Sequence, residues 1–207
     1  MKRSAPTIRA VLFDADGVLQ SNTNGWIDRV RRLSGQNERA DEFLAELFAA
    51  ERPCMIGKAD FAQELASVLN AWNSKTEASE AINLWRQIEP NEAVFEHIRS
   101  IRQRGTKVAL ATNQQRYRAE YILNQLAYAE QFDHILLSCD LGYAKPSIEY
   151  FRESITRVGI DADQILFIDD GAANVEAARL AGLNAEQFYL SEGTGALERV
   201  LASYRIT

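Results

Sequence analysis

Two pairs of acidic residues follow apolar stretches of the chain. Asp14 and Asp16 come after one such stretch, and Asp169 and Asp170 come after another. Neighbouring carboxylates repel one another unless a cation holds them or one of them keeps a proton. Each pair could therefore bind a metal ion or place an acid beside a nucleophile. A solvated turn or a helix cap would explain either pair alone.

Taken together, the two pairs favour a metal site. In open parallel sheets, ligands bind outside the carboxyl ends of the strands. Four acids at two strand ends on one side of a sheet would form an oxygen-rich site. Mg²⁺ prefers carboxylate and water ligands, so it is the cation that this pattern favours.

Two further polar stretches follow apolar runs. Thr112 and Asn113 come after the run at 107–111, where a hydroxyl and backbone N–H groups could hold a phosphate oxygen. Thr112 could equally open the next helix as a cap. Lys145 precedes Pro146, which suits the first turn of a helix. A lysine gains nothing from the positive end of a helix, so its position makes sense if an anion or a carboxylate lies close by.

These residues require a sheet that brings distant strand ends together. Five short apolar runs predict buried strands: Ile8–Phe13, Lys107–Ala111, His134–Ser138, Gln164–Ile168 and Glu186–Leu190. Between them lie helical patterns, such as Val94, Ile98 and Ile101, which recur with helical spacing. Alternating strands and helices predict an α/β fold, a Rossmann-like parallel sheet flanked by helices.

One segment interrupts this alternation. From about residue 21 to residue 89 the sequence shows helical patterns and no strand signal. Roughly seventy residues are far more than a crossover between two strands needs. We therefore expect an inserted helical cap domain at 21–89 and a catalytic core formed by 1–20 and 90–207. The tryptophans of this segment, Trp26, Trp72 and Trp85, are expected to serve packing.

The composition and net charge argue against several classes of protein. The net charge of −6 argues against a nucleic-acid partner. No apolar run is long enough for a membrane span, and the first residues lead into no signal-peptide core. The two cysteines lack the spacing of a zinc site or a disulfide framework. We expect a cytoplasmic enzyme without a membrane partner.

The four polar stretches, in this order, resemble the motifs of the haloacid dehalogenase-like hydrolase superfamily. The resemblance covers almost the whole chain, and the helical insertion lies where that family has a cap. Three stretches are most similar to the subfamily of glucose-1-phosphate phosphatase-like proteins and the N-terminal phosphatase domains of epoxide hydrolases. These stretches are Ala111–Gln114, Leu141–Pro146 and Phe167–Ala181.

The resemblance implies a role for each motif residue. Asp14 would be the nucleophile that forms an aspartyl-phosphate, and Asp16 the general acid and base. Lys145, as a catalytic residue, would pair with Asp14 and bind the phosphoryl group together with Thr112 and Asn113. The implied ligands of a catalytic Mg²⁺ are Asp14, the backbone carbonyl of Asp16, Asp169 and Asp170.

The function expected from this resemblance is a Mg²⁺-dependent phosphatase. Its substrate would be a small phosphorylated metabolite such as a sugar phosphate, and the protein would be a monomer or a homodimer. A phosphosugar mutase on the same core is the main alternative. A 2-haloacid dehalogenase is disfavoured by Asp16, because a halide leaves without a proton. A non-catalytic phosphate-binding protein would be expected to have a broken motif.

Overall fold

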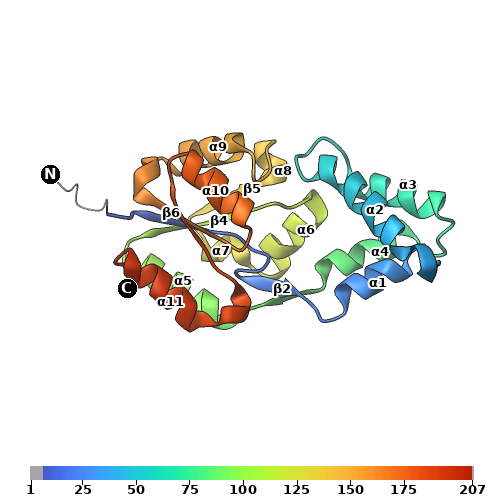
Figure 1. Ribbon diagram of the computed structural model, residues 1–207, viewed down its shortest axis with the longest axis horizontal. Coiled ribbons are helices and arrows are strands. Elements are labelled where there is room, and N and C mark those ends of the chain that lie inside the picture. The colour runs from blue at the N-terminus through green and yellow to red at the C-terminus, as the bar shows by residue number, and fades with distance from the viewer. Residues whose placement is uncertain (1–6, 207) are drawn as a thin grey trace.

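A five-stranded parallel sheet forms the centre of the computed structural model, which describes residues 7–206. The sheet has the order β5-β4-β1-β6-β7 (Figure 1). Its strands are β1 (Ala10–Phe13), β4 (Lys107–Thr112), β5 (His134–Leu137), β6 (Ile165–Asp169) and β7 (Asn184–Gln187). Because β1 pairs with β4 and β6, the residues after it lie at the middle of the carboxyl edge. The predicted α/β fold with a Rossmann-like parallel sheet is confirmed.

Helices cover both faces of this sheet (Figure 1). In β1, Val11 and Phe13 face one hydrophobic cluster, while Ala10 and Leu12 face the other. The first face is covered by α5 (Glu92–Gln103), α6 (Arg116–Glu120) with its continuation Tyr121–Gln125, α7 (Tyr128–Gln131) and α11 (Thr194–Ser203). The second is covered by α8 (Ser138–Leu141), α9 (Ile148–Val158) and α10 (Ala172–Leu180). Burial on both faces explains why the strands read as continuous apolar runs.

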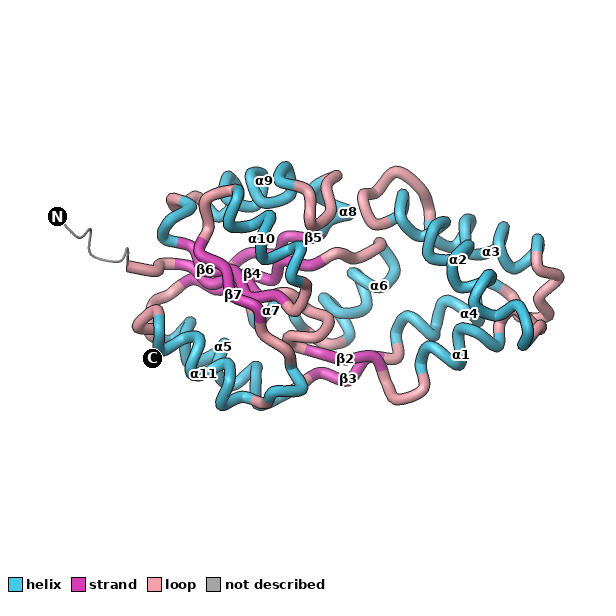
Figure 2. The backbone as a smooth tube through the Cα atoms, viewed as in Figure 1, coloured by secondary structure: helices cyan, strands magenta, loops and turns pink. Residues whose placement is uncertain are grey.

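A bundle of helices lies beyond the carboxyl edge of the sheet, on the side toward which β1 runs (Figure 2). It consists of α1 (Trp26–Arg32), α2 (Ala40–Cys54), α3 (Phe61–Ala71), α4 (Ala78–Ala81) and the 3₁₀ turn Ile82–Arg86. It has a hydrophobic core of its own, in which Phe43, Leu47 and Leu65 are fully buried. The helical insertion therefore buries its apolar faces internally, as a separately packed layer does.

A short antiparallel ribbon connects the two parts of the chain. Strand β2 (Gln20–Asn22) pairs with β3 (Ile88–Pro90). The expectation that residues 21–89 contain no strand was therefore wrong at both ends. Each strand has only three residues; β2 is polar throughout and β3 ends in a proline, so neither carries a local strand signal, and their mutual pairing forms them.

Several strand limits also differ from the sequence prediction. β7 begins two residues earlier than expected and ends at Gln187, because the apolar residues that follow leave the sheet. β6 includes Asp169, which was expected to lie just beyond the strand. No helix within residues 7–206 is long and apolar enough to cross a membrane.

Candidate active site

The carboxyl edge of the sheet gathers the predicted motif residues. Asp14 follows β1 directly, Thr112 ends β4, and Asp169 ends β6. All three are buried, with Thr112 1% and Asp169 0% exposed. Because β1 lies between β4 and β6, the fold brings these three stretches together, as the sequence predicted.

Lys145 lies between two of the carboxylates. Its Nζ is 2.8 Å from Asp14 Oδ1 and 2.6 Å from Asp169 Oδ2, and its side chain is 1% exposed. The expected partnership with Asp14 is therefore present, with Asp169 as a second partner. Lys145 does not open the next helix: α9 begins at Ile148 and Ser147 caps it.

Asn113 holds the Lys145 segment in place. Its Oδ1 accepts a hydrogen bond from the backbone N–H of Lys145, and its Nδ2 donates to the Lys145 carbonyl, both at 2.9 Å. This reciprocal pair joins the end of β4 to the loop that carries the lysine. In the structure Asn113 is thus a positioning residue, and its predicted contact with substrate stays a prediction.

Three carboxylates fit a hard divalent cation. One oxygen each from Asp14, Asp169 and Asp170 lies within 4.8 Å of the others. Among the described residues, Asp14 Oδ2 and the Asp170 carboxylate receive no hydrogen bond from another residue. Asp169, by contrast, accepts bonds from Lys145, Gly171 and Asn174. Oxygen donors with free lone pairs suit Mg²⁺, and Asp14 and Asp170 are the better placed of the three.

Gly17 leaves room for Asp170. A Cβ at this position would lie 2.2 Å from Asp170 Oδ2, and the backbone has φ +78°. Any side chain at 17 would be strained in this left-handed conformation and would displace the carboxylate. Gly17 is therefore required to make room for the carboxylate of Asp170.

Asp16 is bound by a buried arginine that the sequence did not indicate. Arg118 donates to both carboxylate oxygens of Asp16, at 2.5 and 2.7 Å. Gln20 and Gln114 each donate one further bond, at 3.0 Å. Gln114 also donates to Thr112 Oγ1 at 3.1 Å. Gln114 lies just before α6 and Arg118 lies within it, and Arg118 donates to Gln114 Oε1 at 2.8 Å, so the two side chains form one polar cluster around Asp16 that no local sequence signal indicates.

The pKa values of Asp14 and Asp16 are shifted in opposite directions. Burial raises the pKa of Asp14 to about 7; Lys145 opposes the shift and Asp169 adds to it. Burial would also raise the pKa of Asp16, but the charge and hydrogen bonds of Arg118 outweigh it and lower that pKa. Burial and Asp169 raise the pKa of Asp170. The carboxylates of Asp14 and Asp170 are therefore poised to gain from a bound cation, which favours their charged forms.

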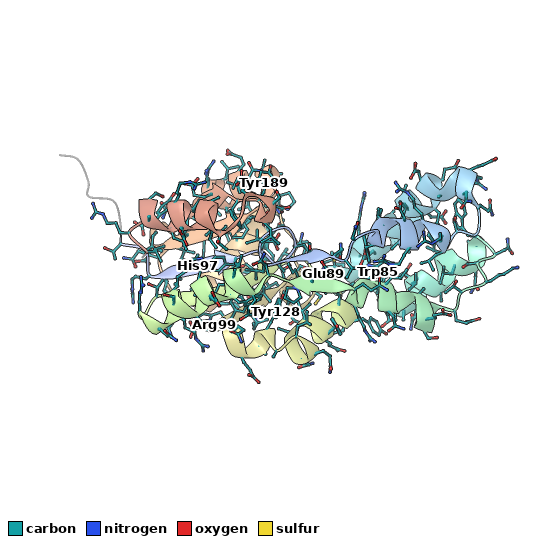
Figure 3. The ribbon with its side chains drawn as sticks, turned by 90° about the horizontal axis from the view of Figure 1, so that it is seen from below. Trp85, Glu89, His97, Arg99, Tyr128 and Tyr189 are labelled. Atoms are coloured by element: carbon teal, nitrogen blue, oxygen red, sulfur yellow. The ribbon has the colours of Figure 1, made fainter. Side chains whose placement is uncertain are left out.

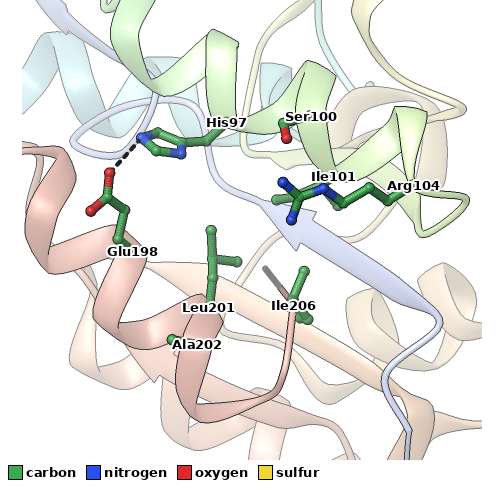
Figure 4. Close-up of a pocket in the computed structure, with 8 residues that line it drawn as sticks. All are labelled: His97, Ser100, Ile101, Arg104, Glu198, Leu201, Ala202 and Ile206. Atoms are coloured by element: carbon green, nitrogen blue, oxygen red, sulfur yellow. Dashed lines mark ion pairs between the residues drawn. The ribbon is translucent and has the colours of Figure 1, made fainter.

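Another cavity in the molecule lacks this chemistry. A pocket of about 380 Å³ lies between α5 and α11 (Figure 4). Its polar lining residues include His97, Arg104 and Glu198, with His97 Nε2 3.5 Å from Glu198 Oε1. None of the acidic motif residues lines it, so the candidate active site is the carboxyl edge of the sheet.

Comparisons with known proteins agree with this geometry. A phosphorylated carbohydrates phosphatase of Thermotoga maritima is 24% identical, over 92% of this chain and 91% of its own length. A phosphoglycolate phosphatase of Rhodospirillum rubrum is 24% identical over 84% of this chain and 77% of its own. A HAD family enzyme from Bacteroides thetaiotaomicron, solved with magnesium and inorganic phosphate, superposes with a TM-score of 0.79 at 21% identity. That match covers 92% of this chain and 98% of the other.

The family model for haloacid dehalogenase-like hydrolases matches residues 8–182. This range contains all four polar stretches that converge at the carboxyl edge of the sheet. The chain belongs to the haloacid dehalogenase-like hydrolase family.

Proposed function

We propose that this protein is a Mg²⁺-dependent phosphatase that hydrolyses a small phosphomonoester, a sugar phosphate, through an aspartyl-phosphate on Asp14. The observation that carries the proposal is the convergence of three carboxylates and Lys145 at one edge of the sheet. The phosphatase names of the relatives support it, as does the magnesium and phosphate bound by the structural neighbour. The subfamily of glucose-1-phosphate phosphatase-like proteins belongs to the same proposal.

Asp14 supplies the nucleophile. Its Oδ1 is held by Lys145 and by the backbone N–H of Ala15, which leaves Oδ2 to attack phosphorus. A bond forms between Oδ2 and phosphorus while the bond from phosphorus to the ester oxygen breaks. Water then attacks the same phosphorus, which frees the carboxylate and releases inorganic phosphate. Covalent catalysis thus divides one difficult displacement into two easier ones.

Asp16 handles the proton in both steps. It gives a proton to the departing alkoxide and then takes one from the attacking water. Arg118 favours the charged form of Asp16, which suits the second step. For the first step Asp16 must carry a proton, and we infer that the negative charge of the substrate phosphate favours this protonated form while Arg118 stays bound. The Asp16 side chain is 42% exposed, which leaves part of its carboxyl group open to the ester oxygen.

The remaining residues would bind the metal ion and the phosphoryl group. Asp14, Asp169 and Asp170 would hold Mg²⁺, with the backbone carbonyl of Asp16. When bound, the ion supplies Lewis-acid stabilisation of charge on the phosphoryl oxygens. Lys145 balances two carboxylates, and Thr112 at the end of β4 would bind the phosphoryl group with its hydroxyl.

The helical segment at 21–89 would act as a cap over this site. Its loop after α2 rests on the core, because a Cβ on Gly57 would lie 2.5 Å from the carbonyl oxygen of Cys139. Trp85 lies where the insertion meets the core (Figure 3). Opening of this contact would admit substrate, and closure would exclude bulk water from the phosphoenzyme.

Phosphate release tests the proposed function. The purified protein with Mg²⁺ is expected to convert an aryl phosphate to the phenol and inorganic phosphate, with steady turnover. The measurement is free phosphate over time, and a bisphosphate activator should not be needed. Absence of release from aryl, alkyl and sugar phosphates alike would refute the phosphatase assignment.

Asp16→Asn is expected to depend on the leaving group. An amide gives no proton, so alkyl phosphates should lose about 10²- to 10⁴-fold in the rate of phosphoenzyme formation. Aryl phosphates should lose much less in that step, because a phenolate leaves with little protonation. Single-turnover rates for the two substrates measure this difference. An equal loss on both would contradict the general-acid role.

A further inference from the structure

A cavity of about 210 Å³ opens between the helical insertion and the core, beside Asp16. The insertion contributes Trp26, Glu51 and Trp85 to its walls, and the core contributes Asp16 and Arg118. Pockets for drug-sized ligands are commonly about 300–1,000 Å³. A cavity of this size next to the residue that would protonate the leaving group fits a small leaving group.

Glu51 lines this cavity, and one of its two carboxylate oxygens has no hydrogen-bond partner among the described residues. It belongs to the last turn of α2 and is 5% exposed. Its Oε1 is buried and has no hydrogen-bond partner within residues 7–206. A buried polar atom left unpaired costs free energy, so natural proteins seldom keep one without a reason.

Arg118 has no donor left for Glu51. Its Nε donates to the Trp85 carbonyl at 3.0 Å. The four bonds from its terminal nitrogens reach Asp16 Oδ1, Asp16 Oδ2, Gln114 Oε1 and Asn22 Oδ1. A guanidinium has five N–H donors, so all are used. Arg118 therefore cannot satisfy Oε1 of Glu51, and a ligand in the cavity can bring the donor that this atom lacks among the described residues.

We propose that this cavity holds the leaving group of the phosphomonoester, and that Glu51 accepts a hydrogen bond from a hydroxyl group on it. The proposal rests on the proposed phosphatase function and specifies its substrate class, a short hydroxylated alkyl or polyol phosphate. Trp26 and Trp85, whose ring centroids are 5.9 Å apart, offer apolar surface to the carbon chain between hydroxyls.

A hydroxyl suits the site better than an ammonium group. The Arg118 guanidinium forms part of the same wall, so a second cation would meet a like charge. Burial raises the pKa of Glu51 to about 7, with Arg118 and Trp85 opposing the shift and Asp16 adding to it. A carboxyl group that is partly neutral at physiological pH exchanges hydrogen bonds with a neutral hydroxyl without requiring a full countercharge.

Matched substrates test this assignment. The set is ω-hydroxyalkyl phosphates of two to four carbons, the n-alkyl phosphates with methyl in place of hydroxyl, and the ω-aminoalkyl phosphates. Wild-type kcat/KM is expected to be roughly 10- to 100-fold higher for the best hydroxyalkyl phosphate than for its alkyl match, because the alkyl group leaves Glu51 unpaired. In Glu51→Met this ratio should fall to near one.

Two further measurements separate binding from folding. Glu51→Met is expected to keep or raise the melting temperature, because it removes an unpaired buried acceptor. Glu42→Met, on the exposed part of the same helix, breaks only a surface ion pair with Arg39 and should keep the wild-type ratio.

The results that would overturn the proposal are specific. An equal kcat/KM for hydroxyalkyl and alkyl phosphates in the wild type would remove the donor requirement. A higher kcat/KM for the aminoalkyl series would replace the hydroxyl with an ammonium group. A Glu51→Met variant that keeps the wild-type ratio would exclude Glu51. If an aryl phosphate is turned over while these tests fail, the proposed function stands without this subsite.

Discussion

Asp14→Asn is expected to abolish phosphatase turnover, with a loss on the order of 10⁴-fold or more in kcat. The amide has almost the same shape as the carboxylate but carries no charge with which to attack phosphorus. Asp14 directly follows β1, the central strand of the sheet, and its Oδ1 accepts a hydrogen bond from the backbone N–H of Ala15. The measurement is phosphate release from an aryl phosphate under saturating Mg²⁺.

The structure predicts that this variant still folds. Lys145 keeps its 2.6 Å partnership with Asp169, so removal of the charge at 14 leaves no isolated buried cation. The melting temperature should therefore stay close to that of the wild type. Acid-quenched wild-type enzyme should carry phosphate in a hydroxylamine-sensitive bond, and the variant should carry none. Turnover above a few per cent of wild type in a deamidation-free sample would contradict the nucleophile assignment.

Much of the core could be predicted because its signals are local. Strands such as β6 are buried on both faces and therefore consist of consecutive apolar residues. The acids after them are then placed by topology, since parallel strands end at a common edge. The limits of β7 were less predictable, because it is an edge strand whose ladder includes Asn184 and Gln187. The ribbon β2–β3 was missed because each strand is formed by a partner more than sixty residues away.

The residues that surround the motif acids were not predictable from local pattern. Arg118 is one of three charged residues in the five-residue helix α6, and charged residues of surface helices are usually solvated. Its burial depends on two distant partners, the carboxylate of Asp16 and the backbone carbonyl of Trp85. Glu51 likewise belongs to a helix rich in exposed charge, and its burial depends on the contact between insertion and core. The residues proposed to set substrate specificity and proton transfer are thus buried by tertiary contacts. The positions of the motif acids, by contrast, are determined by the strands that they follow.

Removal of Mg²⁺ is expected to lower kcat/KM by about 10³-fold or more, since a bound metal commonly supplies several kcal/mol of charge stabilisation. Three carboxylates lie close together, and the buried Lys145 forms ion pairs with two of them, Asp14 and Asp169, while the substrate brings further negative charge. Without a divalent ion, burial favours the protonated form of Asp14, which is a poor nucleophile. A chelator should therefore suppress turnover, and added Mg²⁺ should restore it.

The melting temperature tests Mg²⁺ binding at the same site without a measurement of turnover. A ligand at a hundred times its Kd stabilises the folded state by about 2.7 kcal/mol, which corresponds to roughly 5–10 °C in Tm for a chain of this size. Asp170→Asn removes a ligand with no other partner in the described structure and should abolish most of this shift. Asp28→Asn, on the exposed face of α1, should retain it. A Mg²⁺-induced shift that survives in Asp170→Asn, or full activity in excess chelator, would place the ion elsewhere. The three carboxylates would then need another explanation for lying so close together.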